Sequence, residues 1–161
     1  MQNKKKTGTM IQRIQSVYLF LASMACVACM SMGIGRFYTE EGEQVGRLFN
    51  LWMSMPDGQK SLFPWALFII LLVCATLLLA NIFLYKRRVL QLRISLFCLL
   101  ILVGWYAVYA IFAWMKMESM QAMFRPEWPA AFPAIAIVLI WLAKRGIMRD
   151  ILLLKSLDRL R

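Results

Sequence analysis

The stretch that decides the fold is residues 63–114, FPWALFIILLVCATLLLANIFLYKRRVLQLRISLFCLLILVGWYAVYAIFAW. It holds two apolar runs, 63–85 and 89–114, and only the basic triplet at 86–88 separates them. A helix rises about 1.5 Å per residue, so each run is long enough to cross a hydrocarbon core of about 30 Å. Because the connection is so short, we expect the two helices to form an antiparallel hairpin.

Two further apolar runs flank this hairpin. The first, residues 14–33, also has the length of a membrane-spanning helix. The last starts at Pro129 and soon meets Lys144 and Arg145. We expect those side chains to reach the headgroups while the helix continues to about Met148, with a buried or tilted helix as the alternative. The sequence therefore predicts an all-α membrane protein, an up-down-up-down bundle of four transmembrane helices. The predicted helices span about 14–33, 63–85, 89–114 and 129–148.

The connections within this single membrane domain, 1–161, are unequal in length. The one substantial outer loop, residues 34–62, has a turn-forming centre at 40–43, and the segments beside it allow a short two-stranded β-ribbon. Such a ribbon is marginally stable alone in water, so we expect it to lean on the bundle. Near the other end, Gly146 is expected to break the last helix before residues 147–160, where a cytoplasmic interfacial helix is predicted, and the cytoplasmic tail covers 149–161.

Composition places the chain among membrane proteins. Hydrophobic residues make up 61% of it and charged residues 17%, against about 45–50% and about 25% in soluble domains. The formal net charge of +11 suggests nucleic acid as a partner, because basic chains neutralise phosphates. The charges, however, lie beside and between the apolar runs, where membrane proteins carry theirs. We therefore predict the lipid bilayer as a partner and no nucleic acid.

The positive charges alternate in number from one connection to the next. Fourteen of the 19 Lys and Arg residues fall on the side that holds both chain ends. The other side holds Arg36, Arg47, Lys60, Lys116 and Arg125, together with six of the eight acidic residues. By the positive-inside rule, the sequence predicts that both termini are cytoplasmic.

A Cys-x-x-Cys pair, Cys26 and Cys29, lies in the outer half of the first predicted helix. Such a pair can carry disulfide exchange, which makes a membrane thiol-disulfide oxidoreductase one alternative function. Enzymes of that kind use further cysteines outside the membrane, whereas the predicted outer loops contain none. Packing is favoured, because Ala25, Cys29 and Gly33 form a small-residue stripe at four-residue spacing that lets a second helix approach closely.

A small multidrug-type transporter is the second alternative, since it also has four helices in a short chain. Proton-coupled export needs an ionisable group within the membrane. None of the predicted spans contains an acidic residue or a histidine, and the strong charge bias does not suit a protein that inserts in two orientations. The sequence also gives no metal site and no Ser-His-Asp arrangement. We predict no cofactor and favour a non-enzymatic role.

Polar residues within the predicted helices gather toward the cytoplasmic end. Asn81 and Arg93 lie at similar depth across the hairpin, so a hydrogen bond between them is expected. Gln12, Arg13 and Gln15 enter at the same level from the first helix. We interpret these five residues as a structural clasp, with a ligand or partner site as the alternative.

The basic tail is the candidate contact for lipid or a partner. Its cations include Arg149, Lys155, Arg159 and Arg161. Such a cluster next to a membrane helix attracts anionic lipid headgroups. An acidic partner is the alternative, and topology determination alone explains the same charges.

The two ends of the predicted membrane domain resemble those of a known family. Residues 10–15, MIQRIQ, run directly into the first predicted helix, and residues 156–161 read SLDRLR. They are similar to the ends of a family of uncharacterised four-helix membrane proteins of Bacteroidetes, domain of unknown function 4293. The lysine-bearing segment before Met10 departs from the family pattern, which makes Met10 an alternative start.

The resemblance covers residues 10–161 and implies a bacterial inner-membrane protein with the predicted topology and no catalytic residues to carry over. We therefore expect a small inner-membrane protein that serves as a non-enzymatic accessory or structural component. A membrane-protein partner or self-association is compatible with that role.

Overall fold

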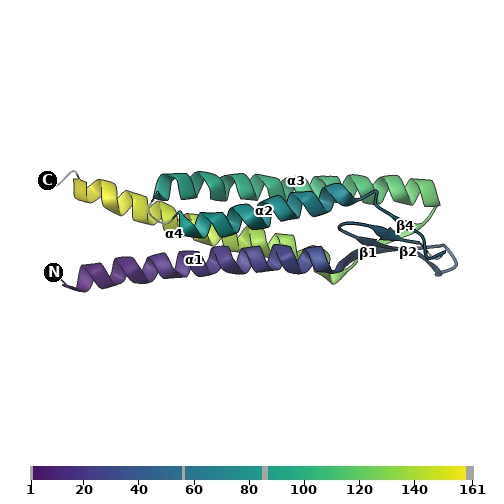
Figure 1. Cartoon of the computed structure of the whole chain (residues 1–161), viewed down its shortest axis with the longest axis horizontal. Coiled ribbons are helices and arrows are strands. Elements are labelled where there is room, and N and C mark those ends of the chain that lie inside the picture. The colour runs from purple at the N-terminus through teal and green to yellow at the C-terminus, as the bar shows by residue number, and fades with distance from the viewer. Residues whose placement is uncertain (1, 56, 85–86, 159–161) are drawn as a thin grey trace.

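The computed structural model describes the backbone of residues 2–55, 57–84 and 87–158, and within these the side chains of 14–152. Four long helices lie side by side along the long axis, and a small sheet covers one end (Figure 1). We call that end the sheet end. The opposite end, where α1 begins and α4 ends, is called the basic end because most of the Lys and Arg residues in the described part of the chain lie there. The helices are α1 (Gln2–Ser31), α2 (Trp65–Phe83), α3 (Arg88–Met120) and α4 (Phe132–Asp158), preceded by the 3-10 helix η1 (Trp128–Ala131).

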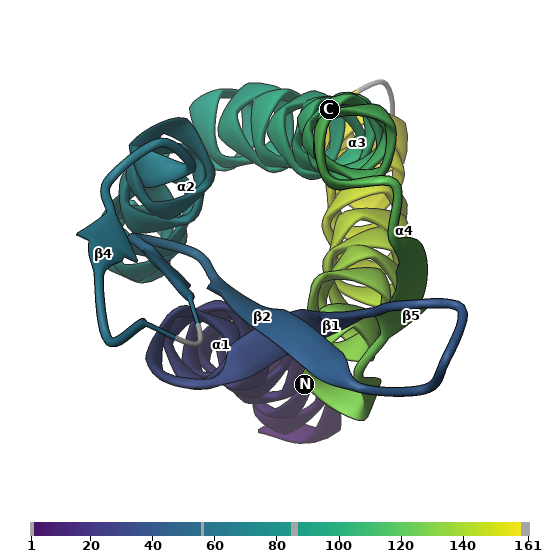
Figure 2. The same cartoon turned by 90° about the vertical axis from the view of Figure 1, so that its right-hand side faces the viewer.

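The helices form a ring in which α1 and α3 each pack against α2 and α4 (Figure 2). Their inward positions make a continuous apolar core, whereas large apolar side chains such as Phe83, Leu100 and Trp114 project outward. A helix that is apolar on its outer face as well as its inner face suits a lipid environment. All four helices are long and apolar enough to cross a membrane, which confirms that part of the predicted fold.

The close packing of α1 on α4 depends on small residues. Ala136 and Ala143 of α4 are fully buried, and a Cβ built on Gly146 would lie only 3.0 Å from Gln15 Nε2 of α1. The expectation that Gly146 breaks the last helix is wrong, because α4 runs through it to Asp158. The missing side chain lets α1 come close, and it does so at small cost to the helix.

Two other helices are longer than the sequence indicates. α1 begins at Gln2, and α3 continues past Trp114 to Met120, where Gln121 ends it in the left-handed conformation (φ 46°). The 33 residues of α3 rise about 50 Å, well beyond the roughly 30 Å of a hydrocarbon core. α3 therefore projects toward the sheet end past the start of α2.

The sheet has five antiparallel strands in the order β4-β3-β2-β1-β5. Between α1 and α2 lie β1 (Gly33–Tyr38), β2 (Gln44–Phe49), β3 (Met53–Ser54) and β4 (Lys60–Ser61), and β5 (Met123–Pro126) follows α3. The β1–β2 hairpin turns at Gly42, whose φ of 86° favours glycine. A ribbon in the 34–62 loop is thus confirmed. The other strands, β5 above all, were not predicted.

Candidate functional site

A carboxylate joins the sheet to the start of η1. The Glu127 side chain, 13% exposed, accepts hydrogen bonds from Arg36 of β1 and Arg47 of β2. Arg47 Nη2 lies 3.2 Å from Glu127 Oε2. The two arginines are directly opposed in the β1–β2 ladder, where like charges repel unless a counter-charge stands beside them. Hydrogen bonds with Tyr38 and Glu127 raise the pKa of the Arg36 guanidinium, because both favour its charged form.

A second carboxylate joins three helices at the basic end. Asp150 Oδ2 of α4 accepts a hydrogen bond from Gln15 Nε2 of α1 at 3.1 Å and lies 3.4 Å from Arg88 Nη1 of α3. Only 7% of the Asp150 side chain is exposed. The sequence put this residue in a cytoplasmic tail, but it lies inside the fourth candidate span, Trp128–Leu152. The expectation that the spans lack an acidic residue is therefore wrong at this position.

A third polar group joins α2 to α3. Asn81 Nδ2 donates to Ser95 Oγ at 2.9 Å and to the Gln91 carbonyl at 3.3 Å, and Gln91 Nε2 donates back to the Asn81 carbonyl. The predicted bond between Asn81 and Arg93 is wrong, because the Asn81 Oδ1 atom accepts no hydrogen bond from the described residues and Arg93 is exposed. Residues 91 and 95 lie one turn apart on the face of α3 that meets α2, whereas residue 93 points away from it.

The predicted clasp is thus two separate clusters. Gln15 belongs to the Asp150 cluster and Asn81 to a cluster with Gln91 and Ser95. The side chains of Gln12 and Arg13 lie outside the described residues. The partners that the sequence reasoning missed, Gln91 and Asp150 among them, are polar residues at helical positions that face a neighbouring helix.

All four cysteines are free and buried. The Cys74 thiol of α2 lies 3.9 Å from the Cys98 carbonyl oxygen of α3, so these two cysteines lie where α2 packs on α3. Cys29 lies nearer the sheet end, where Asn50 Nδ2 donates to its carbonyl at 2.7 Å. Within the described part of the chain, no three residues of the types His, Cys, Asp or Glu are grouped so that they could hold a metal ion.

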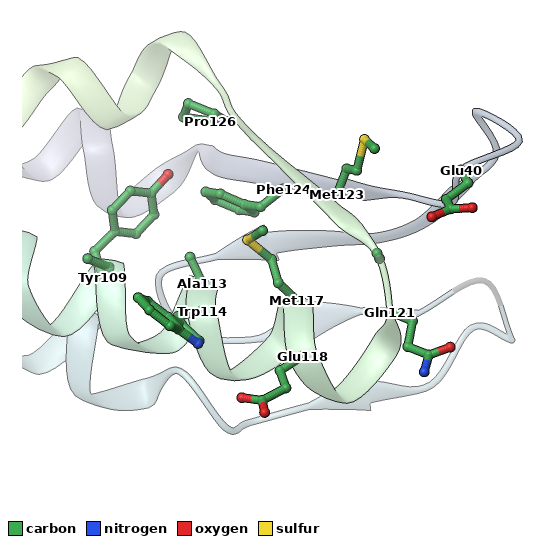
Figure 3. Close-up of a pocket in the computed structure, with 12 residues that line it drawn as sticks. Glu40, Tyr109, Ala113, Trp114, Met117, Glu118, Gln121, Met123, Phe124 and Pro126 are labelled. Atoms are coloured by element: carbon green, nitrogen blue, oxygen red, sulfur yellow. The ribbon is translucent and has the colours of Figure 1, made fainter.

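A groove of about 970 Å³ lies at the sheet end between the last turns of α3 and the strand β5. We call it the sheet-end groove. Figure 3 shows Tyr109 and Met117 on α3 facing Phe124 and Pro126 on the other wall. The Tyr109 hydroxyl donates to the Ile34 carbonyl at 2.7 Å, which fixes the inner end of the groove against β1. Sequence reasoning missed this groove, because β5 had no recognisable signal.

A smaller depression of about 330 Å³ lies on α4 near the basic end. We call it the basic-end pocket. Its lining repeats at helical spacing and consists of Trp141, Lys144, Arg145, Met148 and Arg149. The Arg145 guanidinium lies 5.7 Å from the centre of the Trp141 ring. Of the predicted tail contacts, Arg149 is exposed in this pocket, and the side chains of Lys155, Arg159 and Arg161 lie outside the described residues.

The fold and the two depressions define a class of protein: a chain of four helices apolar enough to cross a membrane, with a small sheet over one end and a basic pocket near the other. A family model described as Domain of unknown function (DUF4293) matches residues 11–160, and the chain belongs to this family. None of the curated proteins matches the sequence.

Proposed function

We propose that this is an integral inner-membrane protein whose four helices cross the bilayer up-down-up-down with both chain ends in the cytoplasm. In this proposal it is a non-enzymatic accessory component of the membrane, held at its basic end by anionic lipid headgroups. The segregation of charge supports the orientation, because the described Lys and Arg residues of the sheet end are few and the acidic residues gather there.

The observation that carries the proposal is the basic-end pocket. Three cations, Lys144, Arg145 and Arg149, surround it, and Trp141 forms its apolar side. Arginine binds phosphate oxygens with paired donors, and tryptophan favours the interface between headgroups and acyl chains. The stacking of Arg145 on Trp141 orients the guanidinium toward that interface. An anionic phospholipid headgroup fits these features better than a neutral one.

The lipid contact is tested by a triple variant, Lys144→Gln, Arg145→Gln and Arg149→Gln. Each cation near an anionic surface contributes about 1 kcal/mol, so we expect phosphatidylglycerol binding to weaken by about a hundredfold in mixed micelles. The matched control removes three cations from the sheet end, Lys60, Lys116 and Arg125, also by glutamine. Equal loss in both triples would show that net charge matters and the pocket does not.

The orientation is tested with a membrane-impermeant thiol reagent on spheroplasts. The four native thiols are buried, so the background labelling is low. We expect Asp57→Cys, exposed beside the sheet, to react, and Arg87→Cys, exposed at the basic end between α2 and α3, to react only after the membrane is opened. The reverse pattern would contradict the proposed topology.

The accessory role is tested by cross-linking in native membranes, followed by purification in mild detergent. A stoichiometric protein partner is the expected result, and recovery of the protein with lipid alone would contradict it. The alternative functions have weaker support. Cys26 and Cys29 are fully buried, which favours packing, and the Asp150 carboxylate is held by Arg88 and Gln15 at a contact between helices.

A further inference from the structure

The sheet-end groove lies at the level where α2 begins. Phe63, two residues before α2, packs against Phe112 of α3 with ring centroids 5.0 Å apart. The lining of the groove runs from Tyr109 on α3 to Gln121 just after that helix, so it starts at this level and extends beyond it. If the helices cross a bilayer as proposed above, the groove opens at the outer membrane surface and is continuous with the acyl chains there.

The walls of the groove are apolar. They are formed mainly by Tyr109, Trp114, Met117, Met123 and Phe124, and the Trp114 residue is 73% exposed. The volume of about 970 Å³ lies at the upper end of the roughly 300–1,000 Å³ of ligand sites. Exposed apolar surface of this extent above a membrane is unfavourable in water and is relieved by an apolar occupant.

The rim of the groove is acidic. Glu40 and Glu118 are the charged residues among the described lining, and in the described part of the chain neither forms a salt bridge. α3 ends at this rim with no basic residue in its last turn. The negative end of its helix dipole therefore adds to the two carboxylates, and a cation is favoured there. The rim is thus acidic in a protein whose net charge is +11.

We infer that the sheet-end groove holds an outer-leaflet lipid whose headgroup carries a primary ammonium, with an acyl chain along the apolar walls and the ammonium at the acidic rim. Continuity with the bilayer selects a lipid over a soluble peptide. The negative charge of the rim favours an amine headgroup over a purely anionic one. This inference rests on the proposed membrane insertion, and it concerns the end of the molecule opposite the basic-end pocket.

The apolar part is tested by blocking the groove. Ala110 is exposed and lines it, whereas Ala107 is exposed on the same helix and does not. Native mass spectrometry of protein from micelles with equal phosphatidylethanolamine and phosphatidylglycerol should show phosphatidylethanolamine retained by the wild type and by Ala107→Trp. Ala110→Trp should lose most of it, and an equal loss in Ala107→Trp, or no loss in Ala110→Trp, would overturn the inference.

The headgroup is tested on the exposed rim, where substitution leaves the core intact. Glu40→Gln combined with Glu118→Gln should lower phosphatidylethanolamine retention by up to about fivefold, because an exposed ion pair contributes about 1 kcal/mol at most. The control pair, Glu41→Gln with Glu43→Gln, lies at the hairpin and not in the groove. Unchanged retention in the rim variant, or an equal drop in the control pair, would overturn the amine headgroup.

The same spectra separate the two proposals. Retention of phosphatidylglycerol should fall in the basic-end triple variant and stay unchanged in the groove variants. Retention of phosphatidylethanolamine should fall in the groove variants and stay unchanged in the basic-end triple variant. If the basic-end triple variant retains phosphatidylglycerol as the wild type does, the basic-end lipid contact is contradicted and the groove assignment is not. If Ala110→Trp releases phosphatidylglycerol instead of phosphatidylethanolamine, the groove assignment is overturned.

Discussion

The two ends of the molecule each contain one largely buried carboxylate with basic or amide partners, but the surroundings differ. At the sheet end, Glu127 bonds Arg36 and Arg47, whose side chains are 39% and 40% exposed. At the basic end, Asp150 bonds Arg88, 28% exposed, and Gln15, which is buried. The sheet end is also held by backbone ladders between strands, whereas α1, α3 and α4 are joined at the other end by side chains.

This difference indicates where single side chains matter. A ladder of backbone hydrogen bonds survives the loss of one side chain, and half-exposed arginines can turn to water. Helices that meet only through side chains have no backbone hydrogen bonds between them that would remain after such a loss. A partner left behind in an apolar interface keeps the full cost of its unmet polar group.

The largest effect is expected for Asp150→Ala. It leaves Gln15 without its acceptor and Arg88 without its counter-charge, so the free energy of unfolding should fall by about 2–3 kcal/mol. Denaturant titration in mixed micelles measures this, with the exposed Asp57→Ala as the control. Asp150→Asn, which keeps an acceptor for Gln15, should lose about half as much. A loss equal to that of Asp57→Ala would show that the cluster contributes nothing.

A smaller effect is expected for Glu127→Ala at the sheet end. Its arginine partners are about 40% exposed, so the loss should be about 1 kcal/mol. The loss should shrink further in 1 M salt, because exposed charges are screened. The same titrations at low and high salt test it, with Glu41→Ala in the hairpin turn as the control. If Glu127→Ala costs as much as Asp150→Ala, the contrast between the two ends fails.

The smallest effect is expected for Ser95→Ala, which removes one hydrogen bond between α2 and α3. Hydrogen bonds between membrane helices average about 0.6 kcal/mol, and Asn81 keeps its bond to the Gln91 carbonyl. The matched control is Ser31→Ala, whose hydroxyl bonds only within its own helix. Thermal unfolding of both variants should show a small shift for Ser95→Ala and none for Ser31→Ala; the opposite order would contradict the role of the Asn81 contacts.

The helices were predictable because each is marked by a long, continuous run of apolar residues. The continuation of α4 through Gly146 and the strand β5 were not predictable in this way. The break expected at Gly146 rested on the low helix propensity of glycine, but that propensity costs only about 1 kcal/mol, and α4 continues through Gly146, which lies beside Gln15 of α1. β5 has four residues and ends in Pro126, so it carries no alternation that marks a strand. It exists because β1 offers an edge for it to pair with.

The candidate sites were less predictable than the helices. The basic-end pocket could have been found, because Trp141, Lys144, Arg145 and Met148 recur at the spacing of one helix face. The sheet-end groove could not, since one of its walls depends on β5. The partner of Asn81 was misjudged because similar depth in a membrane does not fix which face of a helix a side chain occupies, as the exposed Arg93 shows.

The place of β5 in the chain sets the order in which the molecule is completed during synthesis. β1 to β4 leave the ribosome before α2, whereas β5 follows α3. Until α3 has returned the chain to the sheet end, one edge of β1 lacks its partner. The last ladder therefore forms only after the helical hairpin is in place. A nascent chain that stalls before residue 123 keeps an open strand edge, which is the kind of surface that chaperones and proteases recognise.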